Sequence, residues 1–431
     1  MKRIYLYTLF LSLIVSFTFA QDDYVNDNEL RYEDYIYKPN IKTVQLYETS
    51  WEFAQPLLKF GSGEQLQLSF DDLDADKKQY SMTIVHCDAK WNPSDLMITE
   101  YVVGFQDLNF LTWNYSVNTL QKYTHYSILF PTANMQLSKS GNYIVYVYQD
   151  GDKSKLVLSR RFMIFDEKVS VLATIKQAIG NDEQYEKQHM DFSIVNTSYN
   201  ITNSYIDLKV VLTQNYRWDN AVYDIKPTFN TPNQLTYSLD DASTFNGGNE
   251  FRYFDTRSLR TYTERVSNIY KDSSNHYVAE LMVDQNRSFQ NYIFYNDLNG
   301  GFLIKNKDLA TNQDIEADYV KVNFFMKDES PSPEGNFYVL GKLTNWKMDK
   351  ANRMTYNYKR QGYECNLLIK QGYYNYIYAF LKDKNKAGDE TLTEGNHWET
   401  ENDYIIYVYH RQRGTYYDQL IGLRKFNSRK Q

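Results

Sequence analysis

Short runs in which aromatic and β-branched residues alternate with polar ones recur from Thr43 to His410, and clusters of turn-forming residues separate them. Successive side chains of a strand point to opposite faces, so each run predicts a half-buried β-strand. The chain holds 41 Tyr and 24 Phe against 18 Gly and 8 Pro, a β-rich bias without low complexity. We therefore expect an all-β fold of tandem immunoglobulin-like or E-set antiparallel β-sandwich domains.

The first 20 residues have the layout of a cleaved secretory signal peptide. Lys2 and Arg3 precede an apolar run over residues 4–19, and Thr18, Phe19 and Ala20 stand before Gln21. The run is too short and wrongly flanked for a lasting membrane span. No cysteine stands at the junction, so no lipid anchor is indicated. We expect a mature protein that is soluble outside the inner membrane.

The chain of 431 residues is long enough for about three domains that each bury a core. We expect a lead segment over residues 21–41, an N-terminal β-sandwich over 42–166, a middle β domain over 167–316 and a C-terminal immunoglobulin-like domain over 317–431. In the first of these domains, alternation predicts strands at residues 43–47, 65–70, 80–85, 125–130, 142–148 and 157–164.

Charge and histidine spacing exclude several functions. The net charge is −7, whereas nucleic-acid binding favours a basic surface. The six histidines occur singly and never at metal-ligand spacing, and the chain has neither a nucleophile elbow nor a phosphate-binding glycine loop. We therefore predict no catalytic residues, no cofactor and no metal centre. Gly247 and Gly248 predict a tight turn, because no strand-to-helix unit surrounds them.

The stretch over residues 80–105 joins two strand-like runs through a loop. On a strand, His86 and Cys87 point to opposite faces, which argues against a catalytic Cys/His pair and favours a buried structural thiol. Trp91 precedes Pro93 at the strand end and is expected to pack back over it. The second cysteine, Cys365, lies in a different expected domain, and spacing alone gives little support for a disulfide between the two.

An acidic segment over residues 71–76 allows two interpretations. Asp72, Asp74 and Asp76 alternate as ligands of a calcium ion would. Lys77 and Thr83 stand where an EF-hand needs glycine and glutamate, so a solvated acidic turn is favoured. Elsewhere, residues 259–270 fit either a helix or a strand with a loop.

The segment that follows the strand-like run at residues 207–213 also has two interpretations. It contains Asn215, Tyr216, Arg217 and Trp218. Simple packing makes it a hairpin loop whose tryptophan caps the core. Arginine, tryptophan and tyrosine also dominate binding hot spots, so these four residues are candidate anchors for a protein partner.

Several blocks resemble one family in the same order. HCDAKWNPSDLMITEYVVGF, YSVNTLQKYTHYSILFP and SGNYIVYVY are similar to the N-terminal domain of the type IX secretion system plug protein of Bacteroidota. The later blocks that resemble the same family are QNYRWDNA, GGNEFRYFD, EADYVKVNFFM, NFYVLGKLTNW, KQGYYNYIYAF and TENDYIIYVYH. The resemblance covers nearly the whole mature chain and depends on the number and order of the blocks.

This resemblance implies a periplasmic, non-catalytic protein that docks on the outer-membrane translocon barrel and occludes it when no cargo is exported. It implies contact with the membrane only through that partner, as a monomer in a one-to-one complex. It implies no role for nucleic acid.

Two alternatives stay open. FYVLGKLTNWKM and KQGYYNYIYAF are similar to immunoglobulin-like modules of glycogen-active proteins, which makes Trp346, Tyr374 and Tyr376 candidates for stacking on sugar rings. The same residues at a period of two also fit a sandwich core. The chain is then a carbohydrate-binding or structural protein of the cell envelope. An outer-membrane barrel is disfavoured by strongly charged segments between strands and by an end at Gln431 that is no strand.

Overall fold

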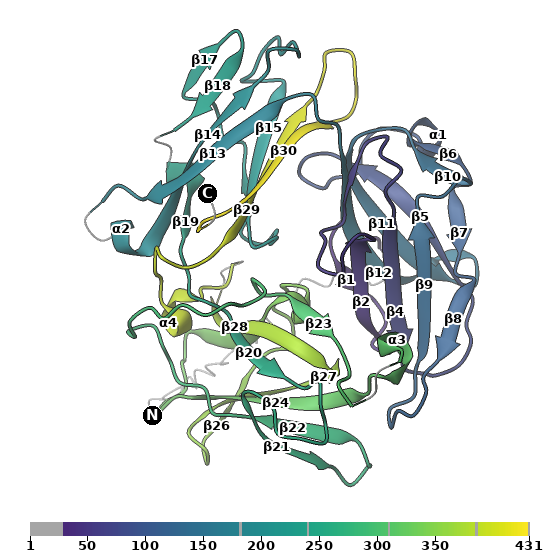
Figure 1. Ribbon diagram of the computed structural model, residues 1–431, viewed down its shortest axis with the longest axis vertical. Coiled ribbons are helices and arrows are strands. Elements are labelled where there is room, and N and C mark those ends of the chain that lie inside the picture. Colours follow the sequence, from purple (N-terminus) through teal and green to yellow (C-terminus); the bar gives the residue numbers. More distant parts are fainter. Residues whose placement is uncertain (1–28, 181–182, 239–240, 309–310, 384–386, 430–431) are drawn as a thin grey trace, which may run out of the picture.

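The computed structural model describes residues 29–180, 183–238, 241–308, 311–383 and 387–429, and Figure 1 shows them as three β-rich lobes around a common centre. We name them unit 1 (residues 29–166), unit 2 (residues 167–247 with 402–429) and unit 3 (residues 248–401). The expected signal peptide, residues 1–20, lies outside the described residues. No described helix is long and apolar enough to cross a bilayer.

Unit 1 is a sandwich of two main sheets, drawn in purple and blue in Figure 1. Its elements are β1 (Tyr35–Ile36), β2 (Ile41–Glu48), β3 (Leu57–Lys59), β4 (Leu66–Asp72), β5 (Tyr80–Cys87), α1 (Ile98–Tyr101), β6 (Val102–Gly104), β7 (Asp107–Asn109), β8 (Thr112–Tyr115), β9 (Thr124–Phe130), β10 (Met135–Leu137), β11 (Gly141–Gln149) and β12 (Asp152–Phe165). One sheet has the order β1-β12-β11-β5-β7, with β3 parallel to β12, and the other has the order β2-β4-β9-β8. The short pair β10-β6 stands apart from both.

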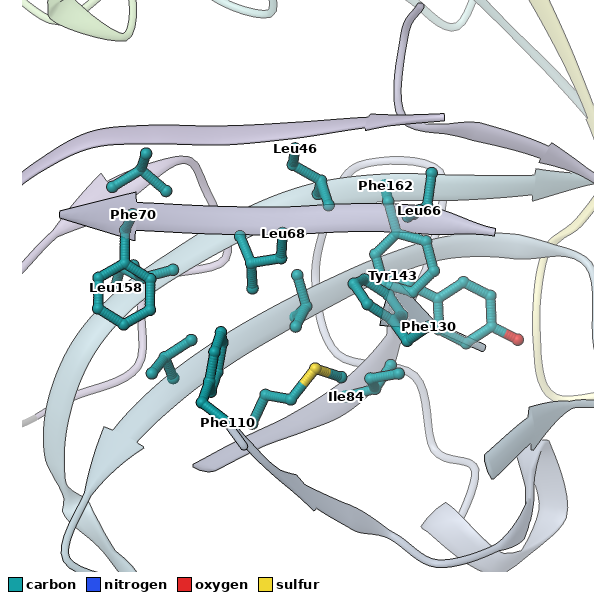
Figure 2. Packing of buried hydrophobic residues seen from close by; sticks show 14 of the residues in the cluster. Leu46, Leu66, Leu68, Phe70, Ile84, Phe110, Phe130, Tyr143, Leu158 and Phe162 are labelled. Carbon is teal, nitrogen blue, oxygen red and sulfur yellow. The ribbon is translucent and has the colours of Figure 1, made fainter. Parts of the chain in front are cut away.

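The core of unit 1 follows from alternation along its strands. Leu66, Leu68 and Phe70 of β4 are all fully buried and point toward the opposite sheet. Figure 2 shows Tyr143 and Phe162 of the opposite sheet near the Leu66 end of β4, and their rings stack with centroids 5.1 Å apart. The predicted fold of antiparallel β-sandwiches is therefore confirmed.

Unit 2 is built from two segments that are far apart in the sequence. Its elements are β13 (Ser170–Gln177), α2 (Glu183–Glu186), β14 (Lys187–Val195), β15 (Leu208–Gln214), β16 (Val222–Tyr223), β17 (Phe229–Thr231), β18 (Gln234–Tyr237), the 3-10 turn η1 (Asp241–Ser243), β19 (Thr244–Asn246), β29 (Asp403–His410) and β30 (Gln419–Asn427). One sheet has the order β13-β14-β18-β17, with β19 on β14, and the other has the order β16-β15-β29-β30.

The structure differs from the expected C-terminal domain over residues 317–431, because β29 from that segment pairs with β15 of the middle segment. Leu208 pairs with His410 and Gln214 with Tyr404, and the side chains between them share one apolar core. Almost all of β15 is buried, while its hairpin partner β16 has only two residues. The strand therefore needs a second neighbour, and the C-terminal segment returns to supply it.

Unit 3 packs a short sheet against a longer one. Its elements are β20 (Arg252–Asp255), β21 (Val266–Lys271), β22 (Tyr277–Leu281), β23 (Phe302–Ile304), α3 (Gln313–Glu316), β24 (Tyr319–Lys327), β25 (Gly335–Leu340), the 3-10 turn η2 (Lys342–Thr344), β26 (Thr355–Asn357), β27 (Gly362–Lys370), β28 (Gly372–Lys382) and α4 (Thr391–Glu394). The longer sheet has the order β21-β22-β24-β27-β26, in which β22 and β24 run parallel. The short sheet is β20-β28-β23, with β25 on β28.

The core of unit 3 crosses the boundary expected between residues 316 and 317. Phe254 and Ala279 lie in the same cluster as Val320 and Tyr376. Residues on both sides of that point bury one another, so unit 3 continues across the position where the sequence predicts a domain boundary. Of residues 259–270, for which the sequence left helix and strand open, residues 259–265 form a loop and residues 266–270 belong to β21.

Buried Asp71 at the end of β4 joins unit 1 to unit 3. Lys370 places its Nζ 2.7 Å from Asp71 Oδ2, and the Tyr319 hydroxyl donates to the same oxygen at 2.7 Å. His125 Nδ1 lies 2.7 Å from Oδ1. Burial alone raises the pKa of Asp71, but the Lys370 ammonium and His125 stabilise the carboxylate and hold its pKa below the ordinary value.

We predict that Lys370→Met lowers the free energy of unfolding by about 3–5 kcal/mol, because it leaves a buried carboxylate without its cation. Urea unfolding measures this. The double variant D71N/K370M should lose less than the two single variants together, since no buried charge is then left alone.

Lys59→Met is the matched control, because Lys59 pairs with Glu167 at the same 2.7 Å distance but on the open surface. It should change stability little, since exposed pairs contribute little. Equal losses in the two single lysine variants would contradict the role given to Asp71.

Candidate functional site

Units 1 and 2 share a second apolar core at the centre of the molecule. Cys87, Ile144 and Met163 of unit 1 lie in one buried cluster with Tyr407 and Leu420 of unit 2. A cluster of this kind fixes the orientation of two sheets in the same way as the inside of a domain does. We refer to the region where the three units meet as the junction.

An aromatic and cationic stack covers this core. Trp91 of unit 1 meets Trp218 of unit 2 edge to face, with ring centroids 4.9 Å apart. The Arg161 guanidinium lies 4.7 Å from the Trp91 centroid and 5.6 Å from that of Trp218, within cation–π range. Trp91 is buried as expected, and the contact it makes reaches across units.

Buried Asp418 provides the polar link between units 1 and 2. Its carboxylate accepts the backbone N–H of Ala89 at 2.9 Å, and Lys209 Nζ and Arg411 Nε each lie 2.7 Å from it. Burial raises the pKa of Asp418, but Lys209, the Ala89 N–H and Arg411 outweigh burial and lower it. Nearby, the Tyr409 hydroxyl donates to Asn142 at 2.8 Å, also across the two units.

Arg217 links unit 2 to unit 3 and is not an exposed anchor. Its side chain is 5% exposed and forms ion pairs with Asp219 at 2.7 Å and Glu390 at 3.0 Å. The guanidinium also lies 4.6 Å from the Trp346 ring centroid. Asn215 is buried too, and Trp218 lies against the shared core. Arg217 and Asn215 are therefore engaged within the chain, and the role of residues 215–218 as anchors for a separate protein stays a prediction.

The chain passes from unit 2 to unit 3 at Gly247 and Gly248. A Cβ at Gly247 would lie 2.1 Å from the carbonyl oxygen of His397, so glycine is required for this close approach. Gly248 has a φ of 65°, in the left-handed region that favours glycine. The connection at Gly247 therefore packs against His397, in the segment that leads from unit 3 back to unit 2.

The expected sugar-stacking platform is not exposed. Tyr376 is 1% exposed and donates to Asp284 at 2.6 Å inside unit 3, and Tyr374 is buried in the same core. Trp346 is half-buried, with Arg217 over its ring and Gly300 so close that a Cβ would lie 2.3 Å from it. A stacking residue needs an open ring face, whereas both tyrosines lie in the core of unit 3, as the sandwich-core interpretation predicts.

His86 and Cys87 are both buried and make separate contacts. His86 Nδ1 lies 2.9 Å from the Ser94 hydroxyl, and burial lowers the pKa of His86 to about 4. Burial raises the pKa of Cys87 to about 12 and that of Cys365 to about 11, so both thiols stay protonated at neutral pH. Both cysteines are free. Cys87 is therefore the structural thiol that the strand geometry favours.

The acidic segment after β4 is organised around a lysine. Asp72, Asp74 and Asp76 come together, and Lys78 forms ion pairs with all three. Asn40 also donates to Asp72 and Asp74 at 2.6 and 3.0 Å. The Lys78 ammonium thus takes the position that a calcium ion would need.

A cavity of about 510 Å³ opens at the junction, and all three units contribute to its wall. The structure brings together here Asn215, Tyr216, Trp218 and Trp346, which the sequence singled out for two different reasons. The polar and aromatic residues around them are Asp34, Trp51, Arg160, Arg161, Asp297, Asn299, Lys342, Asn345, Glu401, Asp403 and Asn427. A cavity of this size falls in the range of small-molecule sites.

Asp297 lies on the unit 3 side of this cavity. Its carboxylate accepts the backbone N–H groups of Phe251 and Asn299 at 2.5 and 2.6 Å. Burial raises the pKa of Asp297 to about 7, and the negative charges of Glu250 and Glu401 act in the same direction against the two N–H donors. Asp297 is therefore a proton-binding group near neutral pH.

The sequence did not single out Arg160, Lys342 or Asp297. A local signal existed for the arginine, because Arg160 and Arg161 interrupt the otherwise apolar run of β12 and alternate residues of a strand face opposite sides. Lys342 and Asp297 lie in polar loop sequence in which nothing marks them. Only the packing of the units brings them to one cavity.

The comparisons with known proteins bear out the resemblance over unit 1. The protein-family model described as "Type 9 secretion system plug protein 1st domain" matches residues 41–166. A crystal structure of a hypothetical protein from Parabacteroides merdae is 32% identical, covers 93% of this chain and 100% of its own, and has a TM-score of 0.89. No curated protein matches.

Two further solved structures have almost no likeness. The N-terminal region of an enterococcal surface protein is 8% identical, covers 92% of this chain and 96% of its own, and has a TM-score of 0.19. Three domains of the outer capsid protein Hoc of bacteriophage RB49 are 9% identical, cover 90% of this chain and 96% of their own, and have a TM-score of 0.14. Neither bears on the fold.

We predict that the contribution of Asp297 to the stability of the protein falls as the pH rises toward about 7. Folded Asp297 keeps its proton up to about pH 7, whereas the unfolded chain loses it near 3.8. The folded state then binds more protons between these values, so its advantage is full below the unfolded pKa and is lost above the folded one. Relative to Asp297→Asn, the wild type should lose on the order of 1 kcal/mol per pH unit between about pH 5 and 7.

Urea unfolding at several pH values measures this difference. Asp95→Asn, at an exposed site, is the control and should keep the wild-type slope. Parallel pH profiles for wild type and Asp297→Asn would refute the raised pKa.

Proposed function

We propose, from the premise that this chain belongs to the type 9 secretion system plug protein family, that it is a non-catalytic plug of that system's translocon. It docks on the outer-membrane translocon barrel and occludes the barrel when no cargo is exported. The observation that carries the proposal is the buried bonding of all three units to one another. A protein that closes an opening by its bulk has to keep its shape.

Each pair of units has its own buried link. Units 1 and 3 share the Asp71–Lys370 pair, units 1 and 2 share Asp418 and the apolar core, and units 2 and 3 share the Arg217–Glu390 pair. Three links around a closed ring resist hinge motion at any one of them. A pre-organised body loses less entropy when it binds, which favours a stable dock over a broad face. Such a face should bury more than about 1,000 Å².

The loop after β22 offers a surface for docking. Phe289 is fully exposed, and Met282, Val283, Ile293 and Phe294 are exposed in the same stretch. Exposed apolar side chains gathered in one place mark interaction surfaces in soluble proteins. We name residues 282–294 the apolar loop and propose that it meets the translocon.

Hydrogen bonds and an ion pair hold the apolar loop against α4. The Arg287 N–H donates to the Thr393 carbonyl at 3.0 Å, and its guanidinium lies 2.5 Å from buried Glu394. Asn286 donates to the carbonyl of Leu392, which is itself half exposed, at 2.8 Å. Asn286 and Arg287 therefore bind α4, while the apolar residues of the loop are exposed. This arrangement suits a hot spot for a protein partner.

The family also indicates an envelope location. We place the protein in the periplasm, exported by a signal peptide that is removed, and held at the outer membrane only through the translocon as one monomer per barrel. Family and all-β fold both indicate a structural role. No carbohydrate role is proposed, because the candidate rings are covered.

We predict that the protein co-purifies with the empty translocon and that its deletion lets small solutes leak through the outer membrane. Phe289→Asp should reduce the co-purified amount at least about tenfold, since truncating a hot spot costs more than about 1.4 kcal/mol. Its circular dichroism and unfolding midpoint should match wild type, because the ring contacts solvent.

Leu111→Asp is the control, an apolar residue that is 85% exposed on unit 1. It should co-purify as wild type does. An outer membrane that stays tight in the deletion strain would sink the plug proposal. Full retention of Phe289→Asp would reject the apolar loop as the docking surface.

A further inference from the structure

Arg160 carries a buried guanidinium that the chain leaves partly unpaired. The residue sits in the middle of β12 and is 5% exposed. Its Nη1 donates to the carbonyls of Ser159 and Tyr35 at 3.0 and 3.4 Å. Its Nη2 has no hydrogen-bond partner among the described residues, although it is buried. Leaving such a group unmatched is costly, so it calls for a reason.

Lys342 of unit 3 lines the same cavity as Arg160 of unit 1. No described carboxylate forms an ion pair with its ammonium, which lies 5.9 Å from the ring centroid of Phe302. Burial lowers the pKa of Lys342, and the positive charge of Arg160 lowers it further. Two cations from different units thus repel one another across the junction.

The negative charge of Asp34 acts on both cations, and this carboxylate already accepts a hydrogen bond from the backbone. Its charge opposes the pKa decrease at Arg160 and at Lys342. One of its oxygens accepts the backbone N–H of Arg161 at 2.7 Å. A single carboxylate thus acts on both cations, and it forms an ion pair with neither.

The wall that holds these cations is shared by two cavities. Arg160, Lys342 and Asn345 line the cavity of about 510 Å³ and also a second one of about 430 Å³. Val44 and Phe302 line both as well and supply apolar surface beside the charges. Ligand pockets likewise place convergent polar groups beside apolar surface.

We propose that the junction cavity binds a small organic or inorganic anion through a carboxylate or phosphate group held between the Arg160 guanidinium and the Lys342 ammonium. Guanidinium and ammonium groups bind both kinds of oxyanion through charge-assisted hydrogen bonds. The free Nη2 of Arg160 supplies a donor that nothing else in the described chain uses. This site is separate from the apolar loop and does not depend on the plug proposal.

The ligand would bridge two units. Arg160 belongs to unit 1 and Lys342 to unit 3, so a bound anion neutralises a repulsion between them. Binding should therefore raise the unfolding temperature of the whole chain by mass action.

The test is calorimetric titration and thermal unfolding of the full mature chain with sodium phosphate and, separately, with sodium citrate at constant ionic strength. We expect at least one of them to bind and to raise the unfolding midpoint. Binding of phosphate alone identifies a phosphate ligand, and binding of citrate alone identifies a carboxylate ligand. Lys342→Gln should weaken binding at least tenfold, and without ligand its midpoint should be at or above that of wild type.

Arg160→Lys keeps the positive charge and should fold, but it should weaken binding because the fork of donors is lost. Lys347→Gln is the matched control, since Lys347 lines the second cavity yet already pairs with Glu33. It should bind as wild type does. The proposal is overturned if neither anion binds, or if Lys342→Gln binds as tightly as wild type.

Discussion

The return of β29 to β15 decides the architecture of this molecule. Unit 3 lies in the sequence between β19 and β29, so both of its ends are fastened to unit 2. A unit held at two points cannot swing on a single linker as a terminal domain can. Its third contact, at Asp71, then reaches unit 1 and closes the ring seen in Figure 1. Shape is maintained because each unit is held by both of the others.

Buried charges at these contacts define geometry more than they add stability. Moving an ion pair out of water costs about as much as its attraction returns, so a pair such as Asp71–Lys370 acts mainly by excluding other arrangements. Inside unit 3, Asp284 and Glu394 follow the same logic with Arg252 between them. Arg160 and Lys342 break the pattern, since no described carboxylate pairs with them. Other buried cations, such as Arg217, Arg252 and Lys370, do have carboxylate partners, which sets this pair apart.

Local sequence patterns predicted the strands well and the connections between units poorly. Alternation predicted all six strands expected in unit 1, because apolar and polar residues alternate along a half-buried strand. The pairing that puts Gln214 beside Tyr404 joins residues 190 positions apart and leaves no local trace. The burial and pairing of Arg217 were not predicted for the same reason, since its second carboxylate partner, Glu390, lies 173 positions away. The four candidate residues of the hairpin do lie at the junction, where Arg217 and Trp218 contact other units of the same chain.

The central claim is that three sandwiches behave as one rigid body. Differential scanning calorimetry of the full mature chain tests it most directly, because separate domains ordinarily melt in separate steps. A body locked by contacts at every pair of units should give one transition, with equal calorimetric and van't Hoff enthalpies. Two or three resolved transitions, or a calorimetric enthalpy well above the van't Hoff value, would contradict the claim.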